Sequence, residues 1–486
     1  MDIPKEVKEI INKLEREGFE AYIVGGCVRD FLRNKEPEDW DITTNATPSE
    51  IQRIFPRSFY NNKFFTVTVL TKSQNPKLKE IEVTTFRKEG KYYDKRHPSK
   101  ISFAKSLEED LKRRDFTINA MAMRVKEELF LIDPFSGKKD LERKIIRAVG
   151  KPEKRFSEDA LRMMRAVRLA VSLGKGWKIE KETEKAIKEN AFLIKEISKE
   201  RIRDEFIKII ISERAVEGVE LLRKLRLLKH FLPELEEGYK VTQNKHHIYD
   251  CYEHALRSLD FAVKRNFSLE VRLSALFHDI GKPRTKRGEG PNATFYGHEV
   301  VGAKMTKEIL ERLRFPKKQI EKIVKLVRYH LFYYNVGEVT ESAVRRLIRK
   351  VGLENIDDLI KLRMADRVGS GCKKAEPYKL RHLRYVIEKV SQDPISVKML
   401  KVTGYDVMRI LRLPSGPLVG KILEILLQEV LEEPKKNKKE YLEERIKELG
   451  KLSLEEISSL AQKAKEEKEK IETKRDEMAK KKYWVM

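Results

Sequence analysis

The N-terminal stretch VGGCVRDFLRNKEPEDWD combines residue types that can bind a triphosphate and metal ions. Gly25 and Gly26 separate a strand-like run from the start of a helix, where backbone N–H groups can face an anion. Arg29 falls in the first turn of that helix, where the dipole disfavours a cation unless a phosphate lies beside it. Asp39 and Asp41 would share one face of a strand and could hold one or two Mg²⁺ ions. Taken alone, this pattern is more typical of an ordinary turn.

A third carboxylate on a neighbouring strand would complete a two-metal centre for phosphoryl transfer. Such centres use clustered acids to activate the attacking hydroxyl and to stabilise the leaving group. Glu82, in the strand-like segment EIEVTTF, is the candidate. The predicted catalytic set is therefore Asp39, Asp41 and Glu82.

A second set of residues with metal-binding chemistry lies in the helical part of the chain. The pattern H-x23-HD places His254, His278 and Asp279 in two helical segments, and Asp366 follows in LRMADRVGS. Burying adjacent His and Asp side chains demands polar partners, so a purely structural role is hard to explain. Imidazole and carboxylate ligands suit Mn²⁺, Ni²⁺ or Co²⁺, and Mg²⁺ is a further candidate.

The elements that must position these residues divide the chain into two parts. Strand-like segments are confined to the first third, and they are AYIVGG, FFTVTVL, IEVTTF, ISFA and ELFLIDP. A leading helix, PKEVKEIINKLEREG, is expected to stop at Gly18. From about residue 157 onward the apolar spacing is almost wholly helical. The sequence therefore predicts an α+β head followed by a long helical body.

Length and charge limit the class of protein. A chain of 486 residues is long enough for about three domains. Its 40% of hydrophobic residues argues against a disordered chain, although 37% of the residues are charged. The net charge of +26 indicates a polyanionic partner such as nucleic acid. A Lys/Glu-rich surface of a heat-adapted protein would explain the high total charge, but not the excess of one sign.

Cysteine usage and hydropathy indicate where the protein works. The three cysteines are scattered and make no disulfide or metal-ligand pattern, which favours a reducing cytoplasm. The start MDIPKEVKEI lacks the apolar run of a signal peptide, and no apolar stretch approaches the roughly 20 residues that span a bilayer. We expect a cytoplasmic protein with no membrane partner, and the sequence does not indicate its oligomeric state.

The order of the motifs is more informative than any one of them. GGCVRD…DWDITTNATP is followed by EVTTFRKEGKYYDKRHP, KRRDFTINAMA, LIDPFSGKKDL and RFSEDALRMMRAVRLA, all within residues 25–170. This series resembles class II tRNA nucleotidyltransferases, the CCA-adding enzymes, and their relatives the bacterial poly(A) polymerases. The resemblance implies a polymerase β-like nucleotidyltransferase head followed by an all-helical neck, an HD domain and a tail.

The resemblance also assigns roles in the head. Asp39 and Asp41 would bind Mg²⁺, and Asp115 would hold the ribose 2′-OH and so select ribonucleotides. The other nucleotide-binding positions would be Gly25, Gly26, Arg29, Arg114 and Asn119. A surface ion-pair cluster around Asp115 is the structural alternative, and such clusters contribute little energy.

The segment EDALRMMR could select the base without a nucleic-acid template. Glu158 and Arg162 have the spacing of one helix face, with Asp159 beside them, and a salt-bridge ladder is the structural alternative. An Asp can accept from the exocyclic amine of cytosine or adenine while an Arg donates to a ring nitrogen. The resemblance gives this role to Asp159 and Arg162, with Glu158 holding the arginine. Arg165 and Arg168 would add triphosphate or primer contacts.

The segment KEGKYYDKRHPSKISF resembles the flexible loop with which CCA-adding enzymes switch from C to A. Relatives that add only CC typically lack its D-x-R signature, which is present here as Asp94 and Arg96. The resemblance argues against CC-only addition. It leaves open full CCA addition, A-only addition beside a CC-adding partner, and poly(A) synthesis.

The pattern H-x23-HD followed by GKP resembles the HD superfamily of metal-dependent phosphohydrolases. The metal ligands that this resemblance implies are His254, His278, Asp279 and Asp366. A second metal could be held by His298 and His330, and Lys282 could meet the phosphate. The implied activity is that of a phosphodiesterase or phosphatase, including action on 2′,3′-cyclic phosphates.

The combined expectation is an enzyme that adds CCA to the acceptor arm of tRNA from CTP and ATP. A rival of another class is an HD phosphohydrolase whose head only binds RNA. Basic helices with few aromatic residues favour recognition of a folded RNA by its shape and phosphates. The expected domains are the head at 1–145, the neck with the base-selecting helix at 146–240, the HD domain at 241–390, the tRNA-binding tail at 391–450 and a charged helical extension at 451–486.

Overall fold

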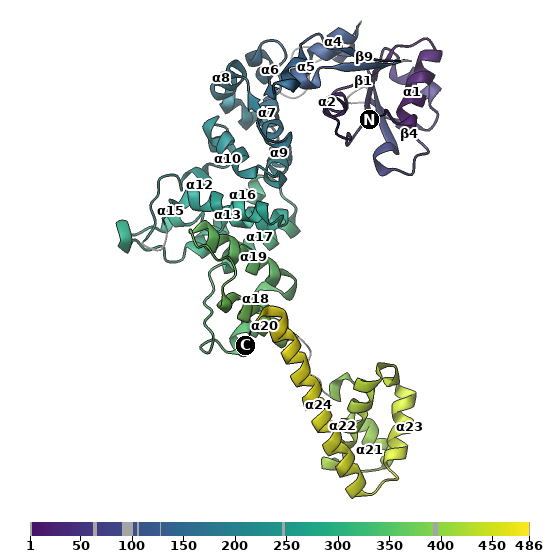
Figure 1. The fold of residues 1–486 in the computed structure, drawn as a ribbon, viewed down its shortest axis with the longest axis vertical. Coiled ribbons are helices and arrows are strands. Elements are labelled where there is room, and N and C mark those ends of the chain that lie inside the picture. Colours follow the sequence, from purple (N-terminus) through teal and green to yellow (C-terminus); the bar gives the residue numbers. More distant parts are fainter. Residues whose placement is uncertain are drawn as a thin grey trace. The chain divides into compact units, whose positions relative to one another are not determined.

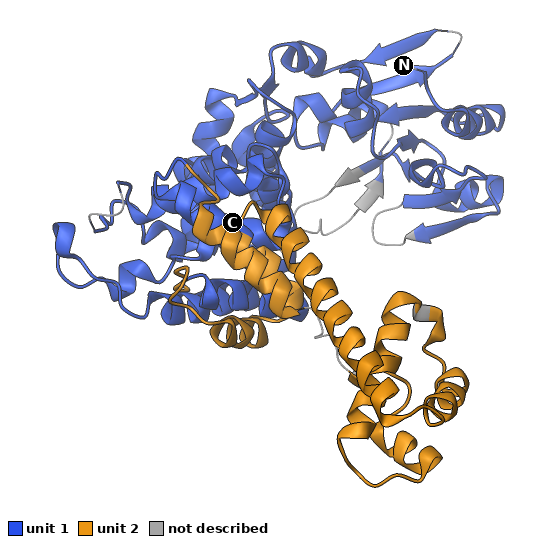
Figure 2. Ribbon diagram, turned by 60° about the horizontal axis from the view of Figure 1, so that its bottom comes forward, with its two compact units in different colours: residues 1–331, 361–373 blue, residues 332–360, 374–486 orange. Residues whose placement is uncertain are grey.

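A computed structural model describes residues 2–61, 66–89, 101–104, 106–126, 128–244, 248–391 and 397–485 of the chain. The loop residues Asp94 and Arg96 lie outside the described residues. The described part forms two compact units, residues 1–331 with 361–373 and residues 332–360 with 374–486 (Figure 2).

The first unit begins with a seven-stranded mixed sheet (Figure 1). The strand order is β3-β4-β5-β2-β1-β8-β9, and only the neighbours β2 and β5 run parallel. The strands are β1 (Ala21–Val24), β2 (Asp41–Thr44), β3 (Ser58–Asn61), β4 (Thr66–Leu70), β5 (Glu80–Thr85), β8 (Ala122–Val125) and β9 (Leu129–Ile132). A separate pair, β6 (Arg87–Glu89) with β7 (Ile101–Phe103), is antiparallel.

Helices complete the head. The leading helix α1 (Lys5–Arg16) is followed by Gly18 at φ +87°, so the predicted stop at that glycine is correct. Helix α3 starts at a capping box in which Thr47 and Glu50 satisfy each other's backbone N–H groups. The other elements are α2 (Gly26–Leu32), η1 (Pro76–Leu78), α4 (Leu107–Lys112), η2 (Thr117–Asn119) and α5 (Gly137–Glu142), and α3 covers Pro48–Ile54.

The sequence did not predict the strands β3 and β8, and it indicated β2 only by placing Asp39 and Asp41 on a strand. β2 is central in the sheet, yet two of its four residues are threonines, which weakens its apolar signal. Thr43 and Thr44 are fully buried, and the Thr43 hydroxyl donates to the Thr84 carbonyl at 3.1 Å. Because the sheet satisfies these hydroxyls, a polar sequence can occupy its centre.

The neck is helical apart from one short parallel pair, β10 (Ile145–Ile146) with β11 (Lys178–Ile179). Its core is continuous with the head core and runs on into the helices that follow. The neck helices are α6 (Pro152–Glu158), α7 (Leu161–Ser172), α8 (Lys181–Asn190), η3 (Ala191–Glu196), α9 (Lys199–Ile211), α10 (Ala215–Lys224), α11 (Leu228–Phe231) and α12 (Pro233–Glu236).

The predicted base-selecting helix is not continuous. α6 ends at Glu158, Asp159 has an extended backbone, and α7 begins at Leu161. The Asp159 carboxylate accepts the backbone N–H of Leu161 at 3.0 Å. Such a local side-chain bond competes with the helical ladder, which explains the break.

The rest of the first unit is a helical domain. Helices α13 and α14 pack together, α16 packs on α17, and α14 also contacts α17. The elements are α13 (Cys251–Lys264), α14 (Leu269–Phe277), α15 (Lys282–Thr285), η4 (Gly290–Asn292), α16 (His298–Arg312), α17 (Lys317–Tyr329) and the second half of α19 (Leu353–Gly369).

The second unit contains a small core of its own. Residues of α21, α22 and α23 and the first part of α24 form this core. The elements are α18 (Glu341–Val351), α20 (Tyr378–Ser391), η5 (Val397–Met399), α21 (Gly404–Leu411), α22 (Pro417–Glu432), η6 (Pro434–Lys436), α23 (Lys439–Leu449) and α24 (Leu454–Tyr483). Among all described helices, none combines the length and apolarity needed to cross a bilayer. The α+β class predicted from the sequence is confirmed.

Candidate active site and candidate metal centre

Two of the three predicted catalytic carboxylates lie side by side in the head. Asp41 opens β2 and is directly opposite Glu82 on the parallel strand β5. Both residues line a cavity of about 290 Å³, which is also lined by three threonines and three arginines. Asp39 lies in the bend before β2 and is exposed, so the prediction that it shares one strand face with Asp41 is wrong. It is not among the residues that line this cavity. Oxygen donors of this kind suit Mg²⁺.

The electrostatics of Asp41 favour a cation at this position. Burial raises the pKa of Asp41 to about 6, and the carboxylates of Glu82 and Asp39 add to the rise, while Arg114 opposes it. Burial and the neighbouring carboxylates both disfavour the ionised form of Asp41, and a cation bound between the carboxylates would offset that cost. The site is therefore suited to hold a divalent ion.

Gly25 is required by the conformation of the turn and by its neighbour. Its φ of +89° is in the region that favours glycine, and a Cβ atom here would lie 2.7 Å from Nη1 of Arg114. The same Cβ would lie 3.7 Å from Oδ2 of Asp41. The glycine thus lets the Arg114 guanidinium lie against the turn, next to Asp41.

A partly buried chain of hydrogen bonds connects helix α2, which follows the glycine turn, to the neck. Arg29 donates from Nη1 to Oδ1 of Asn119 at 2.8 Å, and Asn119 donates from Nδ2 to Oδ1 of Asp115 at 3.2 Å. Arg165 of α7 donates from Nε to Oδ2 of Asp115 at 2.7 Å. Burial would raise the pKa of Asp115, but Arg165, then Arg162, and the hydrogen bonds lower it to about 2.

The ion pair that the sequence predicted between Glu158 and Arg162 is present across the helix break. Arg162 donates from Nη1 to Glu158 at 2.9 Å and from Nη2 to the Arg113 carbonyl at 3.0 Å. Glu158 also accepts from Arg155 at 2.9 Å. Glu158 therefore lies between two arginines, and Arg162 joins the neck to the Arg-Arg-Asp motif of the head.

Helix α9 supplies two residues that the sequence analysis missed. Arg201 donates from Nη2 to Oδ2 of Asp159 at 2.8 Å, and Glu205 accepts from Nε of Arg168 at 2.7 Å. Their i, i+4 spacing in KERIRDEF places them on one helix face. That spacing is the only signal in the sequence, and it is also typical of an ordinary intrahelical pair.

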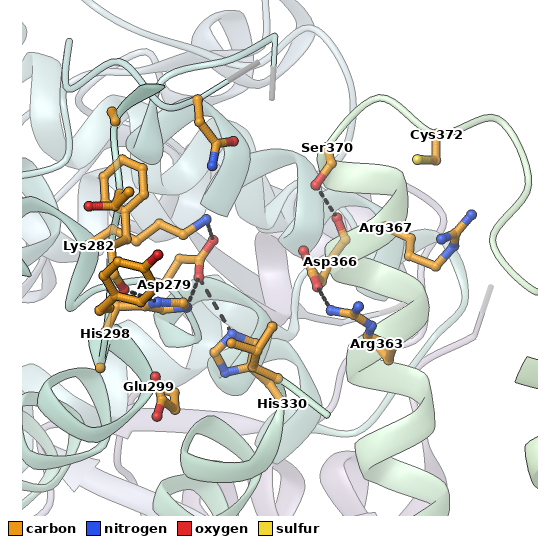
Figure 3. A pocket seen from close by; sticks show the side chains of 17 residues that line it. Asp279, Lys282, His298, Glu299, His330, Arg363, Asp366, Arg367, Ser370 and Cys372 are labelled. Carbon is orange, nitrogen blue, oxygen red and sulfur yellow. Dashed lines mark hydrogen bonds and ion pairs between the residues drawn. The ribbon is translucent and has the colours of Figure 1, made fainter. Parts of the chain in front are cut away.

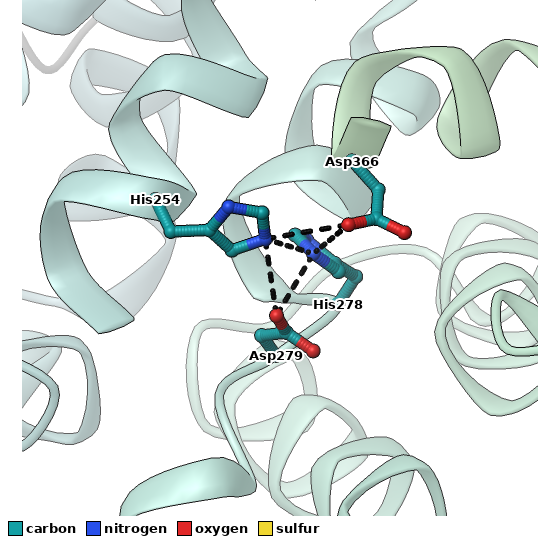
Figure 4. Close-up of side chains that lie close together, drawn as sticks. All are labelled: His254, His278, Asp279 and Asp366. Carbon is teal, nitrogen blue, oxygen red and sulfur yellow. Dashed lines mark hydrogen bonds and ion pairs between the residues drawn. The ribbon is translucent and has the colours of Figure 1, made fainter. Parts of the chain in front are cut away.

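The predicted metal ligands of the helical domain converge (Figure 4). Nε2 of His254 lies 2.9 Å from Nε2 of His278, and Oδ2 of Asp279 lies 3.1 and 3.2 Å from these two nitrogens. Oδ1 of Asp366 lies 3.4 Å from Nε2 of His254. All four side chains are buried.

The hydrogen bonds of the rings leave the Nε2 atoms as metal ligands. Nδ1 of His278 bonds to the carbonyl of Ala275, at 2.9 Å, and His330 and His298 make the same bond to the carbonyl three residues before them, at 2.7 Å. This bond selects the tautomer with a proton on Nδ1 and a lone pair on Nε2. Nε2 of His278 faces Nε2 of His254 and lies beside two carboxylates, and imidazole and carboxylate groups converging in this way fit a divalent metal.

A second possible ligand set shares Asp279 with the first. Oδ1 of Asp279 lies 3.3 Å from Nε2 of His298 and 3.5 Å from Nε2 of His330. Oδ2 of the same carboxylate faces the other two histidines. One carboxylate oxygen is thus directed toward each set.

Close backbone contacts hold these helices together. A Cβ atom on Gly281 would lie 2.4 Å from the carbonyl oxygen of His298 and 2.6 Å from the backbone nitrogen of Gly302. A Cβ atom on Gly369 would lie 2.1 Å from Oγ of Ser258. Glycine at 281 therefore lets α16 bring His298 to Asp279, and glycine at 369 lets α19 pack on α13, close to its metal ligands.

The clustered ligands open onto a cavity of about 670 Å³ (Figure 3). Asp279, His298 and His330 lie on one side of it, and α19 contributes Asp366 and two arginines on the other. The cationic residues that line the cavity are Lys282, Arg363 and Arg367. Nζ of Lys282 lies 2.6 Å from Asp279 and Nη1 of Arg363 lies 2.7 Å from Asp366, so both cations are next to the metal ligands. An anionic group such as a phosphate fits this cavity.

Three known domain families match the chain in order. Residues 21–147 match the poly A polymerase head domain, residues 176–238 match the probable RNA- and SrmB-binding site of polymerase A, and residues 251–369 match the HD domain. The head and HD families coincide with the two sites described above.

Curated relatives are similar to about half of the chain. A CCA-adding enzyme of Listeria monocytogenes is 46% identical over 236 residues, which are 49% of this chain and 58% of that protein. A CCA-adding enzyme of Lactobacillus johnsonii is 50% identical over 204 residues, 42% of this chain and 49% of that protein. The chain spans about half of the length of the curated relatives that it matches.

Solved structures extend the likeness along the chain. The crystal structure of the Bacillus stearothermophilus CCA-adding enzyme in complex with CTP is 29% identical, with a TM-score of 0.57, over 92% of this chain and 98% of that one. A tRNA nucleotidyltransferase complexed with a primer tRNA and an incoming ATP analogue is 25% identical, with a TM-score of 0.50, over 73% and 94% of the two chains. In its head, its RNA-binding region and its HD region, the chain is therefore similar to tRNA nucleotidyltransferases and poly(A) polymerases.

Proposed function

We propose that the protein adds CCA to the 3′ end of tRNA without a nucleic-acid template, with CTP and ATP as substrates. The observation that carries this proposal is the pairing of Asp41 with Glu82, next to Arg114, in a polar cavity. Relatives solved with CTP, or with a primer tRNA and an ATP analogue, support the choice of substrates.

In the proposed reaction, the 3′-hydroxyl of the RNA attacks the α-phosphate in line and pyrophosphate leaves. Asp41, Glu82 and Asp39 would hold Mg²⁺, which would favour the ionised hydroxyl and offset the charge of the leaving group. Arg114, against the glycine turn, binds and orients the triphosphate. Asp115 accepts the ribose 2′-OH.

The choice of base rests on the segment between α6 and α7. Asp159 accepts from the exocyclic amine of C or A, and Arg162 donates to a ring nitrogen. Glu158 and the Arg113 carbonyl hold Arg162, and Arg201 holds Asp159. Because these partners fix both groups, uracil and guanine would leave one of them unpaired.

Incorporation of single nucleotides tests this proposal. The tRNA substrates end at the discriminator, at C and at CC, and each receives CTP or ATP separately. We expect C on the first two substrates and A on the third. Addition of A alone would instead support an A-adding enzyme with a CC-adding partner, and long A tracts would support a poly(A) polymerase.

A matched pair of variants connects the activity to the site. Glu82→Gln removes the carboxylate opposite Asp41, whereas Glu80→Gln changes the same residue type two positions earlier on β5, outside the cavity lining. We expect Glu82→Gln to lose incorporation by more than a hundredfold and Glu80→Gln to retain it, as for removal of a group that acts on the transition state. Full activity in Glu82→Gln would refute its role.

A second activity is proposed for the HD domain, which would hydrolyse phosphoesters. The converging ligands and the cationic cavity favour it. His254, His278, Asp279 and Asp366 would hold Mn²⁺, Ni²⁺, Co²⁺ or Mg²⁺, with His298 and His330 for a second ion. We expect the wild-type protein to hydrolyse a 2′,3′-cyclic nucleotide. Asp279→Ala should lose this hydrolysis and keep CCA incorporation. Loss of both activities would point to misfolding.

Three further parts of the proposal concern the whole chain. The domain boundaries at 145, 240, 390 and 450 stay predictions. The tail, residues 391–450, is proposed to bind the tRNA acceptor arm. The cytoplasmic location expected from the cysteines belongs to the same proposal.

A further inference from the structure

Asn119 is buried and has both ends of its amide engaged. It ends the 3₁₀ turn η2, which packs against α2, and 7% of its surface is exposed. Its Oδ1 accepts from Arg29 at 2.8 Å, and its Nδ2 donates to Asp115 at 3.2 Å. The side chain is thus committed to two protein partners of opposite charge.

The two partners of Asn119 are themselves fixed on their other sides. Arg29 donates from Nε to Asp30 at 3.0 Å and from Nη2 at 2.6 Å. Asp115 accepts from the Phe116 backbone N–H at 2.8 Å and from Arg165 at 2.7 Å. Asn119 therefore joins the Arg29 guanidinium to the Asp115 carboxylate. Without it, α2 would position the first group and the neck the second, independently of each other.

The chemistry of this position requires a short amide. A primary amide accepts from a guanidinium with its oxygen and donates to a carboxylate with its nitrogen. An aspartate at 119 would keep the acceptor for Arg29 but would place a second carboxylate against Asp115. An alanine would supply neither bond.

We propose that Asn119 is a positioning residue that couples Arg29 to Asp115 and thereby sets the preference for ribonucleotides over deoxyribonucleotides. It does this through its two protein partners, in place of the direct nucleotide contact that the resemblance implied. The inference rests on the proposed nucleotidyl transfer, in which Arg29 contacts the triphosphate and Asp115 the ribose 2′-OH. Holding both groups in one network keeps the 2′-OH acceptor in register with the bound phosphates.

Calorimetric titration of the full chain with ATP and with 2′-dATP, without RNA, tests the inference independently of catalysis. In Asn119→Asp we expect the ATP affinity to fall about tenfold, as for the loss of about 1.4 kcal/mol, and the 2′-dATP affinity to change less than twofold. In Asn119→Ala both affinities fall, and the preference for ATP falls as well. Asn355→Ala is the matched control. Asn355 is about as buried as Asn119, it lies far from Asn119 in the sequence, and its amide donates to the Val351 carbonyl.

The two levels of the proposal fail in different ways. A wild-type protein that incorporates neither C nor A overturns the proposed function. A wild-type ratio of ATP to 2′-dATP affinity in Asn119→Asp overturns the role of Asn119, as does the same change of ratio in Asn355→Ala. If Asn119→Asp does not fold by circular dichroism, the ratio in Asn119→Ala decides, and an unchanged ratio there overturns the role.

Discussion

Replacing Arg165 by methionine should destabilise the first unit by leaving a carboxylate buried without its main cation. Asp115 is 8% exposed at its side chain and pairs with the Arg165 guanidinium at 2.6 Å, whereas Arg165 is 39% exposed. The two partners are therefore unequal. Loss of the arginine leaves the buried Asp115 carboxylate without its cation, while loss of the carboxylate leaves a guanidinium that water can reach.

The magnitude follows from the titration of Asp115. Lowering its pKa from 3.8 to about 2 corresponds to about 2.4 kcal/mol of stability at neutral pH. Arg165 is the largest of the contributions that lower this pKa, ahead of Arg162 and Asn119. We expect Arg165→Met to lower the free energy of unfolding by about 2 kcal/mol at pH 7, and Asp115→Asn to lower it by less.

The pH dependence has a definite sign. Because the folded-state pKa is below the unfolded value, this stabilisation is complete above pH 3.8 and is lost as the pH falls toward 2. The difference in the free energy of unfolding between wild type and Arg165→Met should therefore stay constant from pH 8 to about pH 5. It should shrink once the pH approaches the unfolded pKa of an aspartate, about 3.9.

Urea denaturation measures the coupling free energy between Arg165 and Asp115. The four proteins compared are wild type, Arg165→Met, Asp115→Asn and the double variant. Tryptophan fluorescence reports unfolding of the first unit, because Trp40 in the head and Trp177 in the neck are both buried. The double variant should regain most of the stability lost in Arg165→Met, with a coupling of about 2 kcal/mol. A coupling below about 0.5 kcal/mol, or a difference that grows as the pH falls, would show that the pair contributes no more than a surface ion pair.

Three further perturbations test other parts of the molecule. Gly25→Ala should raise the KM for the nucleoside triphosphate about tenfold in steady-state incorporation, because its Cβ would meet Arg114 at 2.7 Å and its φ is +89°. His278→Ala should abolish binding of Mn²⁺ to the HD domain, measured by calorimetry, and leave nucleotide incorporation within twofold. Arg201→Met should increase misincorporation of UTP about tenfold relative to CTP, because it frees the Asp159 carboxylate; unchanged selectivity would contradict that role.

Most of the candidate site could be predicted because its motifs are local in sequence. Gly25 and Arg29 belong to one turn and helix, and His278 and Asp279 are neighbours in the chain. Their residue types restrict the chemistry even before the fold is known. The helical body could be predicted for the same reason, since the helical period depends on residues three and four apart.

Contacts between distant segments could not be predicted in this way. Arg201 and Asp159 are far apart in the chain, and each has an ordinary local explanation on its own. The break at Asp159 was missed because the residues around it have good helical spacing, and one side-chain bond to the Leu161 N–H decides against the helix.

By itself, the sequence determined the kinds of groups present and their local order: a glycine turn before a helix, two aspartates around the start of a strand, and an HD pair at the end of a helix. The tertiary structure decided which of these groups meet. It placed Asp41 opposite Glu82 by strand register, left Asp39 exposed, and brought Asp366 from α19 to the histidines of α13 and α14. The physical reason is that register and helix packing depend on the whole core, whereas turn and helix signals depend on a few neighbouring residues.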